Sequence, residues 1–524
     1  MRARWLGRVR FRDALALQRA LFLHAHDPYL LLLEHPHVFT LGLRGNPANV
    51  LVDPASVGAD LIRTNRGGDV TYHGPGQLVG YPILSWPDGP DASPAYVRSV
   101  EQVVIDACAA VGLAGLGRLP GYPGVWVDPD GPAPRKIAAI GVRRSRGRTM
   151  HGFALNVEPD LAWFDRIVPC GIPDKAVTSL AAEGVAATMR DVVDAVVARA
   201  AVQWDGGRVE RTDAAWHDAA AGRGRMAEAG LAETGGLTIG ERKPAWLRVQ
   251  ADMGPRYREL KQTMRSLDLV TVCEEAGCPN IFECWNDGTA TFMINGERCT
   301  RSCSFCLVDT RRPTGPPDPA EPAHVAEAVA RMGLAHAVVT AVARDDRPDG
   351  GAAQFAATIA AIRSRCPDTA VEVLVPDCKA ADEAWATLFA ARPDILNHNL
   401  ETVARLQRAV RPQASYARSL GLLGAAKAAR LTTKSGLIVG MGESFDEVLA
   451  AMADLRNVGV DILTVGQYLR PTAAHLPVAR WWTPEEFDCL GAAGRAMGFA
   501  HVEASPLTRS SYHAREASQS ATGA

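Results

Sequence analysis

Residues 272–306 read VCEEAGCPNIFECWNDGTATFMINGERCTRSCSFC and hold six of the chain's 11 cysteines in two groups of three. The first group has the spacing C-x4-C-x5-C, at Cys273, Cys278 and Cys284. The second has the spacing C-x3-C-x2-C, at Cys299, Cys303 and Cys306. Thiolates packed this closely favour polynuclear iron–sulfur clusters, because several irons lie within reach of one loop. A cluster held by three cysteines leaves one iron free to bind another molecule.

Three other interpretations of the cysteines explain less. Structural zinc sites use paired C-x2-C or Cys/His knuckles, and neither triplet has that pattern. Disulfides are typical of oxidising compartments and short secreted chains, whereas this chain has 524 residues and no recognisable export signal. A ferredoxin would hold each cluster with four cysteines and leave no iron open. None of the three accounts for both spacings.

The composition is that of a globular protein with two or more domains, because 524 residues exceed one ordinary core. Hydrophobic residues make up 47% and charged residues 22%. A net charge of -2 provides no general attraction to nucleic acid or to anionic membranes. The apolar run 30–33 is too short to span a bilayer. Residues 8–12 alternate Arg with apolar residues, which favours an opening edge strand over a transit peptide. We expect a cytoplasmic, reducing location.

Downstream of the cysteines, strand-like and helix-like segments alternate. The apolar strand-like segments are 336–342, 371–375, 394–399, 435–440 and 461–468. The helix-like segments are 324–333, 355–365, 380–391, 416–430 and 445–457. Repeated units of this kind predict a parallel sheet covered by helices. Their number suggests a barrel or partial barrel, whose chemistry takes place at the carboxyl ends of the strands.

The first 205 residues contain four further motifs: RGGDVTYHGPGQ (66–77), RKIAAIGV (135–142), HGFALNV (151–157) and PCGIPDKAVTSL (169–180). Cys170 lies on a Pro/Gly turn, where it could form a thioester, and Lys136 is a candidate for lowering its pKa. Taken singly, a cysteine in a turn is more often inert. His73 and His151, taken singly, are more often ordinary polar residues.

Together the four motifs resemble those of lipoyl(octanoyl) transferases, which share the fold of biotin and lipoate protein ligases. The resemblance implies that Cys170 accepts an octanoyl group from octanoyl-acyl carrier protein, with help from Lys136. The acceptor would be a lysine on a lipoyl domain, in the E2 subunits of 2-oxoacid dehydrogenases or in the glycine cleavage H protein. The implied substrate pocket consists of Arg66, Gly67, Gly68, Tyr72, His73, Gly74, Gln77, Ala138, Ala139, Ile140, Gly141, His151, Gly152 and Ala154. An ATP-dependent ligase remains an alternative, because GRGR at 222–225 is similar to the phosphate loop of biotin ligases.

The C-x3-C-x2-C loop ahead of the repeated units resembles radical S-adenosylmethionine (SAM) enzymes, and residues 243–516 resemble lipoyl synthases. The shared motifs include RDDRPDGGA (344–352), HNLETV (398–403), TKSGLIVGMGE (433–443), GQYLRPTAAHLPV (466–478) and RSSYHA (509–514). By this resemblance, Cys299, Cys303 and Cys306 hold the 4Fe–4S cluster that cleaves SAM to an adenosyl radical. Cys273, Cys278 and Cys284 would hold an auxiliary 4Fe–4S cluster with a serine as its fourth ligand, Ser511 in preference to Ser510. That cluster would supply the sulfurs inserted at C6 and C8 of the octanoyl chain, and a low-potential electron donor would be needed.

The expected fold class is α/β with two domains. A biotin/lipoate-ligase-like α+β domain would occupy residues 1–205, followed by a linker at 206–242. A radical SAM partial (β/α) barrel would span 243–516, followed by a disordered tail at 517–524. The function that both resemblances imply is octanoyl transfer followed by sulfur insertion. The alternative is an iron–sulfur electron carrier or sensor fused to an ATP-dependent lipoate or biotin ligase-like domain.

Overall fold

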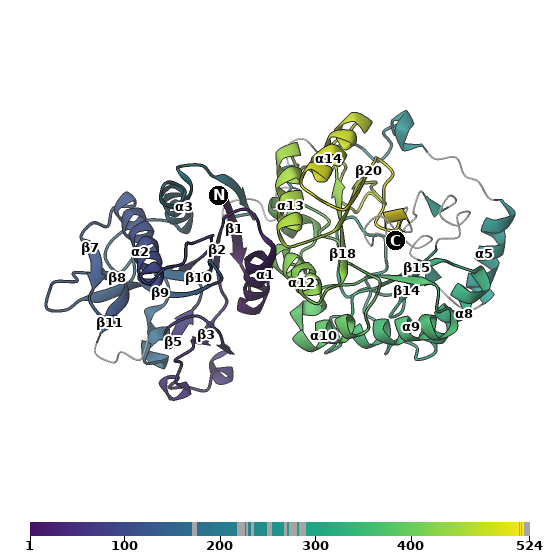
Figure 1. Ribbon diagram of the computed structural model, residues 1–524. Coiled ribbons are helices and arrows are strands. Elements are labelled where there is room, and N and C mark those ends of the chain that lie inside the picture. Colours follow the sequence, from purple (N-terminus) through teal and green to yellow (C-terminus); the bar gives the residue numbers. More distant parts are fainter. Residues whose placement is uncertain are drawn as a thin grey trace. The chain divides into compact units, whose positions relative to one another are not determined.

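The chain forms two compact units, Met1–Trp216 and His217–Ala524, each with its own main sheet (Figure 1). The three-dimensional structure is a computed structural model. It describes residues 1–169, 175–216, 226, 229–231, 235–248, 254–266, 270–271, 280–281, 290–512, 514 and 516–517.

In the described part of the first unit, nine strands form a mixed sheet in the order β12-β1-β2-β6-β10-β9-β8-β7, with β11 paired to β9. These are β1 (Arg2–Arg8), β2 (Tyr29–Glu34), β6 (Gln77–Ile83), β7 (Leu116–Leu119), β8 (Tyr122–Val127), β9 (Arg135–Ser145), β10 (Arg148–Asn156), β11 (Ala176–Val177) and β12 (Glu210–Asp213). A smaller sheet contains β3 (Val38–Leu41), β4 (Asp60–Arg63) and β5 (Val70–His73).

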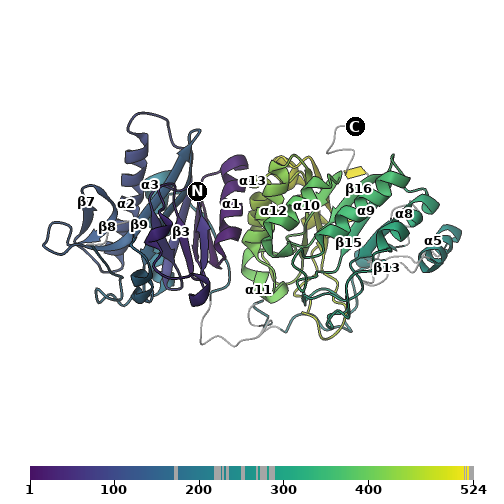
Figure 2. The same cartoon turned by 90° about the horizontal axis from the view of Figure 1, so that it is seen from below.

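Helices cover both faces of the nine-stranded sheet. Helices α2 (Ala92–Ala110) and α3 (Met189–Asp205) pack on one face, and α1 (Phe11–His24) packs on the other (Figures 1 and 2). The alternation of β10 explains this arrangement: Phe153 belongs to the core beneath α2 and α3, whereas Met150 belongs to the core beneath α1. Thr188 starts α3 with a capping box that satisfies two backbone N–H groups.

The structure differs from the expected edge strand at residues 8–12. Strand β1 ends at Arg8, α1 begins at Phe11, and β1 lies between β12 and β2 rather than at an edge. The alternating arginines therefore mark the junction of a strand and a helix. The edge position belongs to β12, whose Glu210 binds the buried Arg4 at 2.8 Å.

Parts of the stretch expected to be a linker, 206–242, pack on the two units. Strand β12 pairs with β1, and the Trp216 ring stacks on Trp5 with centroids 4.5 Å apart. In the second unit, Ala229 is buried and the Leu237 amide donates to Val478 O at 2.7 Å. The segment that packs on the second unit therefore begins before residue 243.

The second unit contains an eight-stranded sheet in chain order, β13 to β20, within its described residues. Strand β13 (Val270–Thr271) is antiparallel to β14, and the strands that follow are parallel: β14 (Ala290–Ile294), β15 (His336–Ala341), β16 (Ala370–Leu374), β17 (Ile395–Asn397), β18 (Thr432–Val439), β19 (Ile462–Gln467) and β20 (His501–Ala504). The helices are α5 (Pro255–Ser266), α8 (Glu321–Met332), α9 (Ala352–Arg365), α10 (Asp382–Ala390), α11 (Gln407–Val410), α12 (Tyr416–Ala428), α13 (Phe445–Asn457) and α14 (Pro484–Ala496). The expected parallel sheet is confirmed, because strand follows strand in order with helical crossovers. No described helix is long and apolar enough to cross a membrane.

Candidate functional sites

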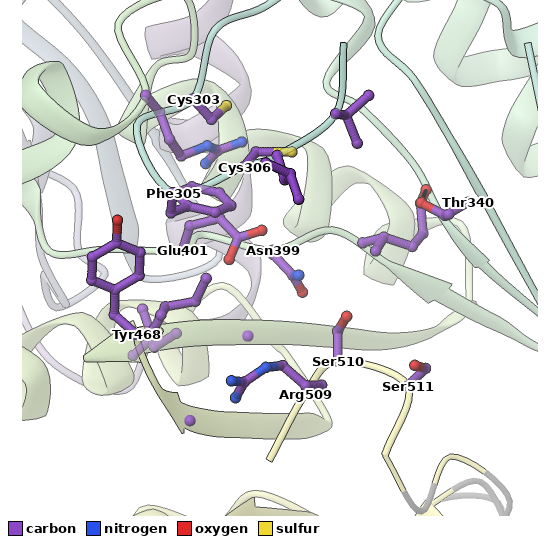
Figure 3. A pocket seen from close by; sticks show the side chains of 18 of the residues that line it. Cys303, Phe305, Cys306, Thr340, Asn399, Glu401, Tyr468, Arg509, Ser510 and Ser511 are labelled. Carbon is purple, nitrogen blue, oxygen red and sulfur yellow. Dashed lines mark hydrogen bonds between the residues drawn. The ribbon is translucent and has the colours of Figure 1, made fainter. Parts of the chain in front are cut away.

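A cavity of about 600 Å³ opens at the carboxyl ends of the parallel strands in the second unit. Thr340 of β15, Leu374 of β16 and Gln467 of β19 contribute to its wall. Because all these strands run in the same direction, their carboxyl ends meet at one edge of the sheet. Figure 3 shows Cys303 and Cys306 on one side of the cavity, with Ser510 and Ser511 on the opposite side.

Cys299, Cys303 and Cys306 all line this cavity, as expected for one ligand set. The Cys299 sulfur accepts hydrogen bonds from the backbone amides of Arg301 and Ala343, both at 3.4 Å. Burial raises the pKa of the Cys303 thiol, and that of the Cys306 thiol to about 12. Bound metal is what would hold such groups as thiolates. Three free thiols on one cavity, with amide donors on one sulfur, fit the donor set of an iron–sulfur cluster.

Arg301, inside the C-x3-C spacing, anchors the cysteine loop to two neighbouring strand ends. Its guanidinium binds both carboxylate oxygens of Asp345, at 2.8 and 2.9 Å, and Asp377 at 2.6 Å. Burial alone would lower the pKa of Arg301, but these two carboxylates raise it above its usual value. The Asp345 contact also explains the RDDRPDGG motif, since that motif follows β15 and reaches the cysteine loop.

Glu401 is a site residue to which the sequence reasoning assigned no role. Its side chain is the only carboxylate among the described residues that line the cavity, and Figure 3 shows it close to Phe305. Its backbone has a φ of 68°, a strained value for a non-glycine residue, and bridges to Leu437 of β18. Burial raises the pKa of Glu401, and the positive charge of Arg411 opposes that effect. The signal was present in HNLETV, but only the fold shows that this glutamate faces the thiols.

The opposite wall of the cavity includes Arg509, Ser510 and Ser511. Both candidate serine ligands therefore reach the same cavity as the C-x3-C-x2-C cysteines (Figure 3). The other predicted ligands of the auxiliary cluster, Cys273, Cys278 and Cys284, lie outside the described residues. The choice between the two serines stays a prediction.

A second, smaller cavity of about 50 Å³ lies in the first unit. Nine of the predicted pocket residues line it: Arg66, Gly68, His73, Ala139, Ile140, Gly141, His151, Gly152 and Ala154. Phe11, Val79, Tyr81 and Phe153 supply apolar and aromatic walls that the sequence reasoning did not name.

The other predicted pocket residues lie around this cavity rather than on its wall. Tyr72 is buried in a neighbouring cluster with Phe39 and Trp163. The Gln77 side chain contacts Nδ1 of His73. Gly74 leaves room for the Tyr72 hydroxyl, which would lie 1.8 Å from an added Cβ. Ala138 belongs to β9, one of the strands that carry the pocket. Gly67 belongs to the turn that leads into it.

A chain of amide side chains determines the tautomer of His73. The Thr178 carbonyl can only accept, so Asn156 Nδ2 donates to it at 2.8 Å. Gln77 Nε2 then donates to Asn156 Oδ1 at 2.9 Å, and His73 Nδ1 donates to Gln77 Oε1 at 2.8 Å. His73 therefore carries its proton on Nδ1.

Two more buried histidines lie nearby in neutral form. His35 Nδ1 donates to the Val9 carbonyl at 2.7 Å, so its Nε2 accepts from the Tyr81 hydroxyl. Burial lowers the pKa of His35 to about 4 and that of His151 to about 3. Burial also lowers the pKa of His73, and the neighbouring positive charge of Arg66 adds to the effect.

These histidines predict that acid destabilises the first unit. In the unfolded chain a histidine binds a proton near pH 6.5, so the unfolded state binds more protons and stability falls as the pH drops below that value. For His35 alone, a folded pKa of about 4 corresponds to a loss of about 3 kcal/mol by about pH 4. Urea unfolding of the full chain at several pH values measures this loss. Limited proteolysis monitors the unfolding through the peptides released from the first unit. The variant His35→Gln should have a shallower pH dependence, and an unchanged slope would contradict the assignment.

Lys136 is the second residue of β9 and is almost fully buried, with Nζ 4.7 Å from the centre of the Trp126 ring. Its backbone pairs with Val177 of β11, and the Thr178 amide donates to its carbonyl at 2.9 Å. Cys170 lies outside the described residues, which end at 169 and resume at 175. Val168 donates to Asn49 O before it, and β11 reaches Lys136 after it.

Family models match both units. A model described as the lipoyl protein ligase A/B catalytic domain matches residues 10–201, and the radical SAM superfamily model matches residues 293–462. A third, the N-terminal domain of lipoyl synthase, matches residues 231–278. The chain thus joins a catalytic domain of the lipoyl protein ligase class to a radical SAM domain.

Close relatives define the second unit further. The lipoyl synthase of Rubrobacter xylanophilus is 58% identical over 281 residues, which are 53% of this chain and 87% of that protein. The lipoyl synthase of Mycobacterium avium is 54% identical over 274 residues, 52% of this chain and 89% of that protein. The chain belongs to the lipoyl synthase family through its C-terminal half, and that family implies iron–sulfur chemistry and SAM. Among solved structures, a bipartite lipoate protein ligase from Thermoplasma acidophilum aligns with 40% of this chain and 86% of its own, at 19% identity and a TM-score of 0.34.

Proposed function

We propose that this chain carries out two consecutive steps of lipoyl-group assembly on the same acceptor protein. The first unit transfers an octanoyl group to a lysine of a lipoyl domain, and the second unit inserts two sulfurs into that octanoyl chain. The observation that carries the proposal is the presence, in one chain, of a lipoyl protein ligase A/B catalytic domain and a lipoyl synthase with its cysteine triplet on one cavity.

In the first unit, the pair of Cys170 and Lys136 favours acyl transfer over ATP-dependent ligation. A ligase activates its acid as an adenylate and needs no reactive thiol. The Cys170 sulfur would attack the thioester of octanoyl-acyl carrier protein, and the pantetheine thiol would leave. The acceptor lysine amine would then displace Cys170, which regains a proton. Lys136 packs against the Trp126 ring near the start of β9, where β11 pairs with it. There it would supply a positive charge for the reaction at Cys170.

In the second unit, the residues of the cavity and the first cysteine triplet would together hold two clusters and SAM. Cys299, Cys303 and Cys306 bind one 4Fe–4S cluster, and Cys273, Cys278, Cys284 and Ser511 bind the other. The clusters and SAM supply the radical and the sulfur when they are bound. Lys243, Arg411, Arg470 and Arg509 give the described wall a positive charge that suits an anionic cluster.

Glu401 would bind the hydroxyl or amino groups of SAM, because it is the one carboxylate of the described cavity wall. We expect Glu401→Gln to raise the dissociation constant of SAM by about 10-fold or more, since a hydrogen bond to a charged group is worth about 1.5–3 kcal/mol. Calorimetric titration of the anaerobically reconstituted protein with SAM measures the change. The exposed Glu383 on α10 provides the control Glu383→Gln. Equal affinities of the two variants would remove Glu401 from the SAM site.

The intact mass of a lipoyl domain tests the proposed function directly. The unmodified domain is incubated without oxygen with the reconstituted protein, octanoyl-acyl carrier protein, SAM and a low-potential reductant. A mass shift matching lipoyl supports both steps. A shift matching octanoyl alone supports only the transferase, and modification that requires ATP and free lipoate supports the ligase alternative. If SAM is not cleaved, the electron-carrier alternative stands.

The fusion would also raise the rate of the overall conversion. A site that is tethered to the source of its substrate encounters it at an effective concentration on the order of mM. An octanoylated lipoyl domain could then reach the second site without full release. The proposed advantage of tethering is contradicted if the separated units, mixed in equal amounts, form lipoyl domain as fast as the intact chain.

The partners implied are octanoyl-acyl carrier protein, the lipoyl domains of E2 subunits and H protein, and a low-potential electron donor. Thiolate-ligated clusters require a reducing compartment, which supports a cytoplasmic location.

A further inference from the structure

The loop that follows β19 contacts the cysteine loop through residues that are not predicted cluster ligands. The Tyr468 hydroxyl, fully buried, donates to Leu476 O at 2.8 Å and lies 3.4 Å from Ser304 O. The Leu476 amide also faces Ser304 O, at 3.3 Å. Two residues of this loop thus contact the backbone between Cys303 and Cys306, and Figure 3 shows Tyr468 and Phe305 on the same side of the cavity.

His475 makes the contact nearest to a predicted ligand. Its Nε2 lies 2.9 Å from the carbonyl oxygen of Cys306, and its Nδ1 lies 2.8 Å from the Thr472 hydroxyl. A carbonyl can only accept, so Nε2 carries a proton and donates it to Cys306 O. Nδ1 of the neutral ring then accepts from the Thr472 hydroxyl. Both ring nitrogens are used, which sets the orientation of the imidazole.

Arg470 keeps His475 in this place. Its Nε donates to the carbonyl oxygens of Thr472 and His475, at 3.1 and 3.0 Å, and its Nη2 donates to Ala473 O at 2.6 Å. These bonds close the turn 470–475 on itself. A rigid turn that presents one N–H to the Cys306 carbonyl is the arrangement expected of a support for a metal ligand.

We infer that His475 is a positioning residue for the cluster at Cys299, Cys303 and Cys306, acting through the backbone of Cys306. The inference rests on the proposed function, in which these cysteines hold a cluster. The Cys299 sulfur accepts from the Arg301 amide within the loop and from the Ala343 amide after β15, whereas His475 contacts the Cys306 end. Removing the N–H donor would let Cys306 move relative to the other two sulfurs and weaken its bond to iron.

The test uses the full chain with Cys273, Cys278 and Cys284 changed to Ala, so that only one cluster can form. His475→Leu, His475→Gln and the control His324→Leu, on α8, are compared in this background. The readouts are iron and sulfide per chain, the rate of iron loss to a chelator, and the electron paramagnetic resonance spectrum of the reduced cluster with and without SAM. We expect His475→Leu to lose iron about 10-fold faster and to change the spectrum, because losing a support of a metal ligand costs about 10–100-fold in affinity.

His475→Gln should recover most of the stability, because its amide N–H can replace Nε2 as the donor to Cys306 O. Iron loss and spectra that are the same in His475→Leu and His324→Leu would overturn the inference. A failure of His475→Gln to recover the cluster would also overturn it, since the donor would then not be the property that matters. If the background protein keeps its iron after Cys303→Ala, the proposed ligand set itself is wrong, which separates that failure from failure of the His475 inference.

Discussion

Replacing Cys303 by Ala should stop the reaction at the octanoyl stage. Cys303 lines the cavity together with Cys299 and Cys306, and these three are the only described cysteines on its wall. With two thiolates left, the cluster loses a ligand, and the loss should exceed the 10–100-fold typical of a support residue, so we expect SAM cleavage to fall by at least about 100-fold. The first unit has its own sheet and core, so octanoyl transfer should continue.

The measurement is the mass of the lipoyl domain together with the yield of the SAM cleavage product. The mass should shift by octanoyl only. Cys489→Ala is the matched control, because Cys489 is an exposed cysteine on α14 and is outside the cavity. Lipoyl formation by Cys303→Ala at the rate of the control would show that the triplet is not the catalytic cluster site.

Replacing Cys170 by Ala should abolish octanoyl transfer and leave sulfur insertion intact. Loss of a nucleophile that forms a covalent intermediate lowers turnover by about 10³-fold or more. Lys136→Ala should lower it by about 100-fold or more, the usual contribution of a positioned acid, base or charge. Both variants should still convert a lipoyl domain that has been octanoylated beforehand.

Cys108 on α2 provides the control in the same unit. It is fully buried, and burial raises the pKa of its thiol to about 12, so it carries almost no thiolate near neutral pH. Cys108→Ala should therefore keep full transfer activity with a small loss of stability. The readouts are the rate of octanoylation and trapping of the acyl-enzyme by mass spectrometry. An acyl-enzyme on Cys170→Ala would exclude Cys170 as the nucleophile.

Much of the second unit could be predicted because its signals are local in the chain. Apolar strand-like segments separated by helix-like ones predict a parallel sheet, and the strands at 336–341, 432–439 and 462–467 lie close to where the periodicity placed them. The C-x3-C-x2-C spacing likewise puts three thiols on one loop without any knowledge of the fold. Residues 8–12 show the limit of such signals, since a period of two over five residues could not separate a strand from the start of α1.

Local sequence alone predicted which residues would carry the chemistry: the two cysteine triplets, Lys136, Cys170 and the glycine-rich segment at 66–77. Only the tertiary structure decided what surrounds them. Arg301 meets Asp345 and Asp377, which are 44 and 76 positions away in the chain, and Glu401 faces the thiols only because β17 and β18 are neighbours. The His475 bond to Cys306 spans 169 positions. Strand order, register and loop path set such contacts, and these depend on packing across the whole sheet rather than on any short pattern.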